Sequence, residues 1–473
     1  MKVVFAQRIW RELLGTMSLS ASLRLDGHHA HVAIAPTVPA LVREVLARRP
    51  DAVAVPWNSD DHRFNVRLVR TLKAARPGLP VIGGGPHPTH APEVIDAAPL
   101  DAICRGDGED ALREWVAARA RGGDGAGIAN LWVRTPGGLV RAELRRAVED
   151  LDDLPDPDRD LYMEHRLLRT NPHKPFMAGR GCPHGCTFCA TPSLRRLYRG
   201  RGRILRWRSP ARVVAEIERV RDRWGLRSAR FEDDTFSQDP AWLAEFLPAY
   251  RRRVGLPFVC YVRADQVTDD LARRLREAGC STVCFGVESG DEDLRNRLLG
   301  KHLRDDELLA AAERLRAAGV RFYTTNMFGL PGETLEQGWR TVHLNRRLRP
   351  DTVWSSVFQP YPGLPLTDRA VREGRVTPEE VAGVITRPFA GNVLRQPDAR
   401  ALFALHLWFP ALVRFPALEP FVRARLAAGP GAVDRLVFLA SYAASAARRS
   451  GIDPVRLAWE GAHWLRFFGS RES

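Results

Sequence analysis

Three cysteines in one short loop are the residues of this chain best suited to chemistry. Cys182, Cys186 and Cys189 follow a CxxxCxxC spacing within the run Gly-Arg-Gly-Cys-Pro-His-Gly-Cys-Thr-Phe-Cys, residues 179–189. Soft thiolates in one loop favour an iron–sulfur cluster or zinc. A four-iron cluster held by three thiolates keeps one iron open for a further ligand. A zinc knuckle is the alternative, but it needs a fourth ligand, and His184 inside the loop is poorly placed to complete a tetrahedron.

The composition sets limits on the class of protein. With 473 residues the chain is long enough for two or three domains with substantial cores. Its formal net charge is +15, and its basic residues are almost wholly arginine. The excess of arginine fits solvated arginine faces on the protein surface. It also fits attraction to an anionic ligand or to a membrane surface. Nothing else in the sequence supports peripheral membrane contact. Basic and aromatic residues are not interleaved in a nucleic-acid motif, so we expect no nucleic-acid partner.

The remaining four cysteines are typical of a protein whose thiols stay reduced inside the cell. They lie on or beside apolar strand-like runs, where free cysteine packs as a small hydrophobe. These residues are Cys104, Cys260, Cys280 and Cys284. The chain opens directly into a strand-like run without a signal peptide, and it holds no clean apolar stretch of membrane-spanning length. We therefore expect a cytoplasmic location.

Short apolar runs alternate with amphipathic segments over residues 1–120, which predicts a doubly wound parallel sheet. The predicted strands are Val3–Ala6, Ala30–Ala35, Ala52–Pro56, Pro80–Gly83 and Ala102–Cys104. Such sheets bind ligands beyond the carboxyl ends of their strands, and glycine there permits close backbone approach. The candidate binding residues at these ends are Trp57, Asn58, Ser59, Gly83, Gly84, Gly85, Gly106, Gly108 and Glu109.

A second strand–helix alternation follows a predicted hairpin over Ala129–Glu143 and an acidic, proline-spaced linker. Its predicted strands are Phe176–Gly179, Ser228–Glu232, Phe258–Val262, Thr282–Val287, Phe322–Phe328 and Thr352–Phe358. Functional residues of parallel barrels gather at the carboxyl ends of the strands. The block Glu232, Asp233 and Asp234 ends one strand, and buried carboxylates need cationic or solvated partners. The sequence of residues 375–473 predicts helices. These helices would form a cap packed on the barrel, a substrate lid or a lipid-facing surface.

The cysteine loop and the strand ends that follow it resemble the radical S-adenosylmethionine (SAM) superfamily. The matching segments after the loop are Phe231-Glu-Asp-Asp-Thr-Phe236, Tyr261-Val-Arg-Ala-Asp265, Gly286-Val-Glu-Ser-Gly290 and Gly329-Leu-Pro-Gly-Glu333. The resemblance implies a partial (β/α)6 barrel in which Cys182, Cys186 and Cys189 hold a 4Fe-4S cluster. SAM chelates the open iron and is cleaved to a 5′-deoxyadenosyl radical. The residues implied to bind SAM are Glu232, Asp233, Asp234, Arg263, Glu288, Ser289, Gly329 and Pro331.

The first sheet resembles the cobalamin-binding domain of the cobalamin-dependent radical SAM family. The resemblance rests on Val-Ile-Gly-Gly-Gly-Pro-His-Pro-Thr, residues 81–89, followed by Gly-Asp-Gly-Glu, residues 106–109. The Asp-x-His-x-x-Gly motif that supplies a histidine to cobalt is absent after the first strand. The resemblance therefore implies cobalamin bound without a protein histidine ligand.

The patterns along the chain and the two resemblances, which cover about residues 1–360, together predict four regions, and the resemblances imply one principal activity. The regions are a Rossmann-like cobalamin-binding domain (1–145), a linker (146–172), the radical SAM partial barrel (173–374) and a helical C-terminal region (375–473). The implied activity is methylation of an unactivated carbon of a small-molecule substrate, with electrons from an external donor such as flavodoxin or ferredoxin. The alternatives are cyclisation or rearrangement without methyl transfer, and a non-catalytic cobalamin or cluster sensor.

Overall fold

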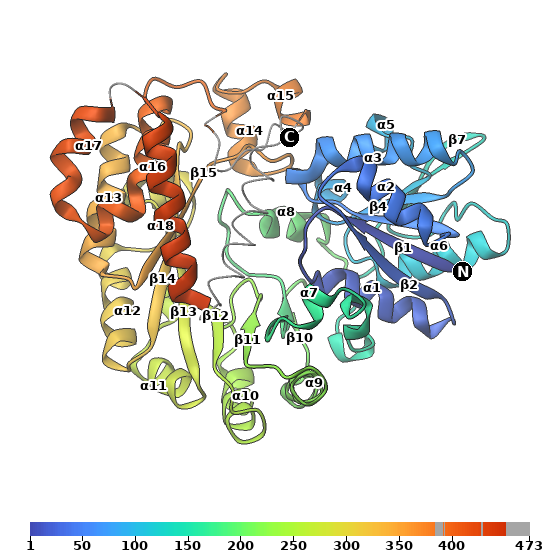
Figure 1. Cartoon of the computed structure of the whole chain (residues 1–473), viewed down its shortest axis with the longest axis horizontal. Coiled ribbons are helices and arrows are strands. Elements are labelled where there is room, and N and C mark those ends of the chain that lie inside the picture. Colours follow the sequence, from blue (N-terminus) through green and yellow to red (C-terminus); the bar gives the residue numbers. More distant parts are fainter. Residues whose placement is uncertain (384–390, 392, 427–428, 451–473) are drawn as a thin grey trace.

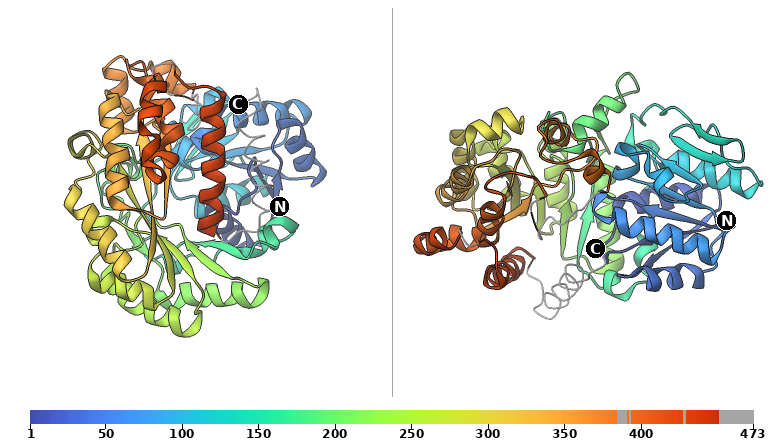
Figure 2. Two further views of the ribbon diagram at one scale, coloured as in Figure 1. Left: turned by 60° about the vertical axis from the view of Figure 1, so that its left-hand side comes forward. Right: turned by 90° about the horizontal axis from the view of Figure 1, so that it is seen from above.

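The computed structural model describes residues 1–383, 391, 393–426 and 429–450. It contains a seven-stranded and a six-stranded sheet, together with a two-stranded ribbon. The first sheet, with its helices, forms one unit, and the second sheet with its helices forms another beside it (Figures 1 and 2). None of the helices in the described part of the chain combines the length and apolar character needed to cross a bilayer.

The first sheet confirms the predicted doubly wound fold. Its strands are β1 (Lys2–Gln7), β2 (His29–Ile34), β3 (Ala52–Pro56), β4 (Val81–Gly84), β5 (Ala102–Cys104), β6 (Leu131–Thr135) and β7 (Gly138–Arg141). The order is β2-β1-β3-β4-β5-β6-β7, with β1 to β5 parallel and β6 and β7 forming an antiparallel hairpin at one edge. In this order the connections reverse direction between β1 and β3, which is where such sheets bind ligands.

Helices cover both faces of the first sheet. Helices α1 (Leu14–Leu25) and α6 (Glu109–Ala120) pack on one face, and α2 (Val38–Ala47) and α3 (His62–Ala75) pack on the other. Short helices α4 (Pro86–His90) and α5 (Val94–Ala97) follow β4, and the 3-10 turn η1 (Ser59–Asp61) precedes α3. The strands are apolar on both sides because both faces are buried.

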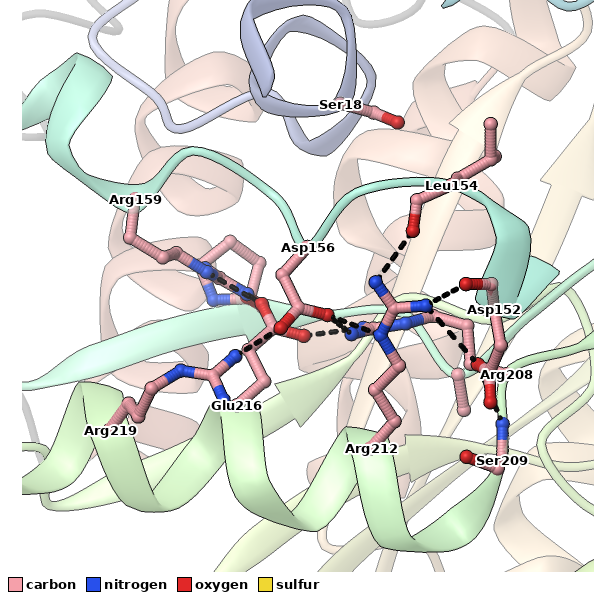
Figure 3. Close-up of polar contacts among 12 residues, drawn as sticks. Ser18, Asp152, Leu154, Asp156, Arg159, Arg208, Ser209, Arg212, Glu216 and Arg219 are labelled. Atoms are coloured by element: carbon pink, nitrogen blue, oxygen red, sulfur yellow. Dashed lines mark hydrogen bonds and ion pairs between the residues drawn. The ribbon is translucent and has the colours of Figure 1, made fainter. Parts of the chain in front are cut away.

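The linker is fixed to the second unit by an ion-pair network (Figure 3). It contains η2 (Leu151–Asp153), η3 (Arg159–Tyr162) and α7 (Arg166–Arg169), and it crosses helix α9 (Pro210–Trp224). Glu216 on α9 is 2 % exposed and binds Arg159 of the linker at 2.7 Å as well as Arg208. Asp156 accepts from Arg212 Nε at 2.7 Å and also binds Arg208. The sequence predicts an acidic, proline-spaced linker here, but it does not indicate this packing against α9.

The second sheet is entirely parallel, as predicted for the partial barrel. Its strands are β8 (His173–Phe176), β11 (Ser228–Phe231), β12 (Phe258–Tyr261), β13 (Cys280–Glu288), β14 (Arg321–Phe328) and β15 (Thr352–Val357). The covering helices are α9, α10 (Pro240–Arg253), α11 (Asp269–Glu277), α12 (Asp305–Ala317) and α13 (Leu335–Leu348), with η4 (Ala264–Gln266) and the π-turn η5 (Leu294–Leu298) between them. Strand β8 ends at Phe176, where the prediction had it begin. Its buried Lys174 is neutralised by Glu12, 2.6 Å away, a long-range contact that the local pattern does not indicate.

The described part of the C-terminal region is helical, as predicted. After α14 (Pro365–Arg372), which still lies within the predicted barrel region, it contains α15 (Pro378–Ala382), α16 (Ala399–Arg414), η6 (Pro416–Leu418), α17 (Glu419–Leu426) and α18 (Ala432–Ser450). Helix α16 packs on β14, β15 and α13 through a shared apolar cluster that includes Phe328, Trp339 and Phe409. This packing is that of a cap on the barrel, one of the alternatives left open by the sequence. The part of the predicted region beyond residue 450 lies outside the described residues.

Candidate active site

The cysteine loop begins from a two-stranded ribbon at the carboxyl edge of the second sheet. Strands β9 (Gly179–Arg180) and β10 (Arg206–Trp207) pair antiparallel, with Arg206 opposite Arg180. Asp233 is 3 % exposed and accepts hydrogen bonds from the backbone N–H groups of Ala178, at 3.0 Å, and Gly179, at 2.6 Å. Burial raises the pKa of Asp233 to about 7, although both backbone bonds oppose the shift. Its carboxyl group is therefore engaged with the backbone that leads into the loop.

The second half of the loop is held by the end of η5. Thr187 donates through Oγ1 to the carbonyl of Leu298 at 2.7 Å and through N–H to that of Leu299 at 2.9 Å. Cys182 and Cys186 lie between these two anchors, Cys189 lies two residues after the second, and all three are partly exposed. Burial raises the pKa of Cys186 and of Cys189, and each of the two groups interacts electrostatically with another cysteine of the loop.

The donor set fits a cluster better than a single metal ion. Within the described residues, no three His, Cys, Asp or Glu side chains converge closely enough to hold one ion. A cubane cluster makes a different demand, because each of its thiolates binds a separate iron. Three accessible thiols spread over one anchored loop satisfy that demand, with no fourth protein thiol beside them.

Strand β13 ends in a strained turn beside the cysteines. Glu288 adopts a left-handed φ of 66°, and the pairing register with β14 shifts between Gly286 and Glu288. A non-glycine residue in this region is strained, and such strain clusters at functional sites. Glu288 Oε1 lies 3.4 Å from Lys301 Nζ and accepts from Thr325 Oγ1 at 3.2 Å. Lys301, which the sequence did not single out, thus balances the buried carboxylate.

Gly286 leaves the space that this carboxylate occupies. A Cβ at position 286 would lie 1.9 Å from Glu288 Oε1 and 2.7 Å from Lys301 Nζ. Arg263 follows β12 and donates to Asp265 Oδ2 at 2.9 Å and to the carbonyl of His302 at 3.0 Å. Arg263 also donates to the carbonyl of Lys301, the residue paired with Glu288, and Lys301 Nζ lies 5.9 Å from the ring centroid of Phe188 in the cysteine loop. The structure therefore brings these two predicted SAM-binding residues to the cysteine loop.

The other residues implied to bind SAM are placed in different ways. Asp234 accepts from Thr191 Oγ1 at 3.3 Å, and Thr191 N–H lies 3.5 Å from Cys189 Sγ, so Asp234 reaches the loop through one residue. Glu232 forms ion pairs with Arg230, at 2.5 Å, and with Arg11 of the first unit, at 3.7 Å. The remaining three are buried, and they are Ser289, Gly329 and Pro331. Contact of any of these side chains with SAM stays a prediction.

Most of the candidate cobalamin-binding residues after β3 and β4 pack on each other. Trp57 is 1 % exposed, and a Cβ at Gly83 would lie 3.2 Å from its ring. Gly85 has a φ of 115°, and a Cβ there would lie 3.1 Å from the carbonyl oxygen of Trp57. Gly84 lies against Cys104. The close approach of the Trp57 segment thus explains why glycines stand at positions 83 and 85. Their contact with a corrin stays a prediction, as does that of the exposed Asn58.

A buried histidine pair beside this segment was missed by the sequence reasoning. Ser59 Oγ lies 3.0 Å from His87 Nδ1, and His87 Nε2 lies 2.7 Å from His62 Nδ1. Burial lowers the pKa of His62 to about 4 and that of His87 to about 3. At the β1/β3 switch point, Arg8 Nη1 lies 3.6 Å from Asp61 Oδ1, and burial raises the pKa of Asp61 to about 6 despite Arg8. Polar groups therefore converge where this topology binds ligands.

The last candidate cobalamin loop, which follows β5, contacts the second unit. A Cβ at Gly106 would lie 2.1 Å from the hydroxyl of Tyr198, the residue that ends α8 (Ala190–Leu197). Gly108 lies against Leu19 and Cys104. Glu109 is 5 % exposed and accepts from Arg180 of the ribbon at 2.6 Å. No local pattern indicates this pairing, because Glu109 and Arg180 are far apart in the chain.

Comparison with known proteins identifies the two units. The family model described as Radical SAM superfamily matches residues 177–344, and the model described as B12 binding domain matches residues 12–116. The chain is 27 % identical to an uncharacterized methyltransferase of Pyrococcus horikoshii, over 68 % of this chain and 70 % of that protein. It is 26 % identical to the anaerobic magnesium-protoporphyrin IX monomethyl ester cyclase of Rubrivivax gelatinosus, over 68 % of this chain and 59 % of that protein.

Two solved structures share the fold. The radical SAM methyltransferase TsrM of Kitasatospora setae, with cobalamin and a 4Fe-4S cluster bound, aligns over 80 % of this chain and 76 % of its own, with a TM-score of 0.63 and 20 % identity. The cobalamin-dependent radical SAM enzyme OxsB aligns over 99 % of this chain and 75 % of its own, with a TM-score of 0.67 and 14 % identity.

The chain therefore carries a B12-binding domain followed by a radical SAM domain. Among proteins with these two domains it is methyltransferase-like, and cyclases are also among its relatives. Its cofactors are those of the two domains, namely a 4Fe-4S cluster, SAM and cobalamin.

Proposed function

We propose that the protein methylates an unactivated carbon of a small-molecule substrate. The observation that carries the proposal is that the cysteine loop, Arg263 and Glu288 meet at the carboxyl edge of the second sheet, in a chain that also carries a B12-binding domain. The cluster and SAM supply hydrogen-atom abstraction when bound, and cobalamin supplies a methyl carrier. The chain positions these groups and excludes water.

Each side chain of the site has a defined part in this proposal. Cys182, Cys186 and Cys189 bind three irons and leave the fourth open for SAM. Glu288, balanced by Lys301, offers carboxylate oxygens to the ribose hydroxyls of SAM, since a carboxylate is a two-oxygen acceptor. Arg263 is already engaged by Asp265 and the carbonyl of His302, so it orients the segment that receives SAM.

The remaining cofactor contacts are proposed at the first sheet. Cobalamin would lie beyond the carboxyl ends of β1, β3, β4 and β5, where Arg8, Asn58 and Ser59 are found. An external electron donor, such as flavodoxin or ferredoxin, would reduce the cluster. The substrate is proposed as a small molecule, in keeping with the tryptophan substrate bound in a TsrM structure.

Anaerobic reconstitution tests the proposal directly. Wild type and a variant with all three loop cysteines replaced by alanine are loaded with iron, sulfide and hydroxocobalamin, and their ultraviolet–visible spectra are compared. We expect wild type to keep the corrin bands and a broad cluster band, and the variant to lose only the cluster band. Cluster without retained cobalamin would contradict methyl transfer through cobalt, and absence of both would contradict the site assignment.

Cyclisation or rearrangement is the second candidate, and the cyclase among the relatives favours it. The mass of the product separates the two reactions, because methylation adds one methylene unit and rearrangement adds none. A non-catalytic sensor predicts that the loaded protein forms no 5′-deoxyadenosine from SAM. Formation of 5′-deoxyadenosine by wild type, but not by the triple cysteine variant, would reject that alternative.

A further inference from the structure

Four charged residues join the B12-binding domain to the ribbon that carries the cysteine loop. We call this set the ribbon–loop contact, and it consists of Asp107 and Glu109 after β5 with Arg180 and Arg206 on the ribbon. Arg180 Nη2 donates to Glu109 Oε1 at 2.6 Å, and its Nη1 donates to Asp107 Oδ1 at 3.3 Å. Arg206 Nη1 donates to Asp107 Oδ2 at 2.7 Å. Each ribbon strand therefore sends one guanidinium to the same loop.

The ribbon–loop contact has a buried and a half-buried member from each unit. Glu109 is 5 % exposed and Arg206 is 4 % exposed, whereas Asp107 and Arg180 are half-buried. Ser18 on α1 donates at 2.8 Å to Glu109 Oε1, the oxygen that Arg180 also binds. Removing one partner of a buried ion pair leaves an uncompensated charge, which makes such contacts sensitive to single substitutions. Tyr198 adds a neutral contact, because its hydroxyl accepts from Asp107 N–H at 2.9 Å.

The covalent path from this contact to the cysteines is short. Arg180 lies two residues before Cys182, and only Gly181 separates them. Gly181 has a φ of 90°, and a Cβ there would lie 2.4 Å from the carbonyl oxygen of Ile204 near the start of β10. Asp233 holds the preceding Gly179 from the barrel side. The start of the loop is thus fixed from both units at once.

We propose that Glu109 and Arg180 are positioning residues that hold the cluster-binding loop against the B12-binding domain and so fix the spacing between the two cofactors. This inference rests on the proposed function, since it takes the cluster to bind at the loop cysteines and cobalamin at the first sheet. It assigns Glu109 to the loop rather than to direct contact with cobalamin.

Hydrogen exchange of the cofactor-free protein tests the contact itself. Glu109→Gln keeps the size of the side chain and removes its charge. We expect amides in residues 179–189 to exchange about tenfold faster in this variant than in wild type, because the Arg180 guanidinium loses its buried counter-charge. Glu12→Gln is the matched control, since Glu12 and Lys174 form a buried ion pair of the same length, 2.6 Å, that also joins the first unit to the barrel but not to the ribbon.

A spectroscopic comparison separates positioning from cofactor binding. In wild type loaded with cluster and kept reduced by excess dithionite, we expect added hydroxocobalamin, which dithionite reduces to paramagnetic cob(II)alamin, to change the electron paramagnetic resonance spectrum of the reduced cluster. Glu109→Gln should bind hydroxocobalamin with wild-type affinity but show no such change. Arg180→Lys keeps the positive charge and should restore part of the response, whereas Arg180→Gln should behave as Glu109→Gln does and serves as a second test if that variant does not fold.

Three results would overturn the inference. The first is unchanged exchange of residues 179–189 in Glu109→Gln, and the second is an equal increase in Glu12→Gln. The third is loss of hydroxocobalamin affinity in Glu109→Gln, which would return Glu109 to a direct cobalamin contact. Failure of wild type to take up a cluster would contradict the proposed function instead, and the exchange experiment, which needs no cofactor, would still decide the contact.

Discussion

Gly286 lies at the point where the Glu288 carboxylate and the Lys301 ammonium group approach the backbone of β13. Because a Cβ there would come within 1.9 Å of Glu288 Oε1, Gly286→Ala must displace that carboxylate. The clashing atoms are ends of flexible side chains, so we expect the fold to keep its stability to within about 1 kcal/mol. SAM cleavage should fall ~100-fold, since small misplacements of binding groups are costly.

Formation of 5′-deoxyadenosine measures this effect, and thermal unfolding measures stability. Gly78→Ala is the control, because no atom lies within 4 Å of a Cβ at that position. Cleavage at the wild-type rate in Gly286→Ala would mean that the placement of Glu288 does not matter to SAM.

The Glu216 carboxylate should contribute strongly to the free energy of unfolding, because it pairs with two guanidinium groups. It is buried between Arg159 and Arg208, and although burial acts to raise its pKa, the two arginines lower it. We expect Glu216→Ala to reduce the free energy of unfolding by about 3 kcal/mol, because both arginines lose their buried partner.

Glu218 on the same helix provides the comparison. It pairs with Arg253, whose side chain is 45 % exposed, so Glu218→Ala should cost less than about 1 kcal/mol. Urea denaturation of both variants measures the difference. Equal losses of unfolding free energy in the two variants would show that the network in Figure 3 is no stronger than a surface ion pair.

At the scale of elements, the loops after β3 and β4 join through the buried pair His62 and His87. Burial holds the pKa of both groups below that of the unfolded chain, at about 4 and about 3. The unfolded chain therefore binds more protons as the pH falls, so stability that is present at neutral pH is lost progressively below about pH 6.5. Each histidine should cost about 1 kcal/mol between about pH 7 and about pH 5.5.

Urea midpoints at these two pH values check the prediction. His87→Asn should weaken the dependence on pH even though it lowers stability at neutral pH through lost hydrogen bonds. His29→Asn, at an exposed position on β2, is the control and should show the wild-type dependence. A wild-type slope in His87→Asn would mean that this pair does not titrate on unfolding.

The elements also show what the sequence could predict and what it could not. Strands such as Ala52–Pro56 and Ala102–Cys104 were predicted to the residue, because both faces are buried and the apolar run is the whole signal. Strand β8 was placed too late, because its lysine is neutralised from a distant loop. The close packing of Gly83 and Gly85 on Trp57 also had no local signal, and contact of these glycines with cobalamin stays a prediction.

The residues of the candidate site also fall into those that the sequence could predict and those that it could not. Three cysteines within eight residues can be recognised locally, because their spacing alone carries the chemistry. Lys301 beside Glu288, and Arg180 beside Glu109, depend on how separate strands and domains meet. Contacts of that kind have no local pattern, and they were found only in three dimensions.

At the scale of the whole molecule, the C-terminal helices complete the core of the second unit. Phe328 and Val353 on β14 and β15, with Trp339 on α13, share one apolar cluster with Leu405 and Phe409 of α16. Removing the chain after residue 398 would expose this cluster, and each large buried side chain contributes about 1.5–3 kcal/mol through burial. We therefore expect that truncation to yield aggregated or unfolded protein.

A second truncation tests whether the effect is specific to α16. Ending the chain after residue 450 keeps α16, α17 and α18, and this product should remain soluble and unfold cooperatively. A soluble, cooperatively folding product of the truncation at 398 would mean that the barrel is stable without its cap. The helices would then be free to act as a lid, the role that the sequence left open and that their burial against β14 and β15 argues against.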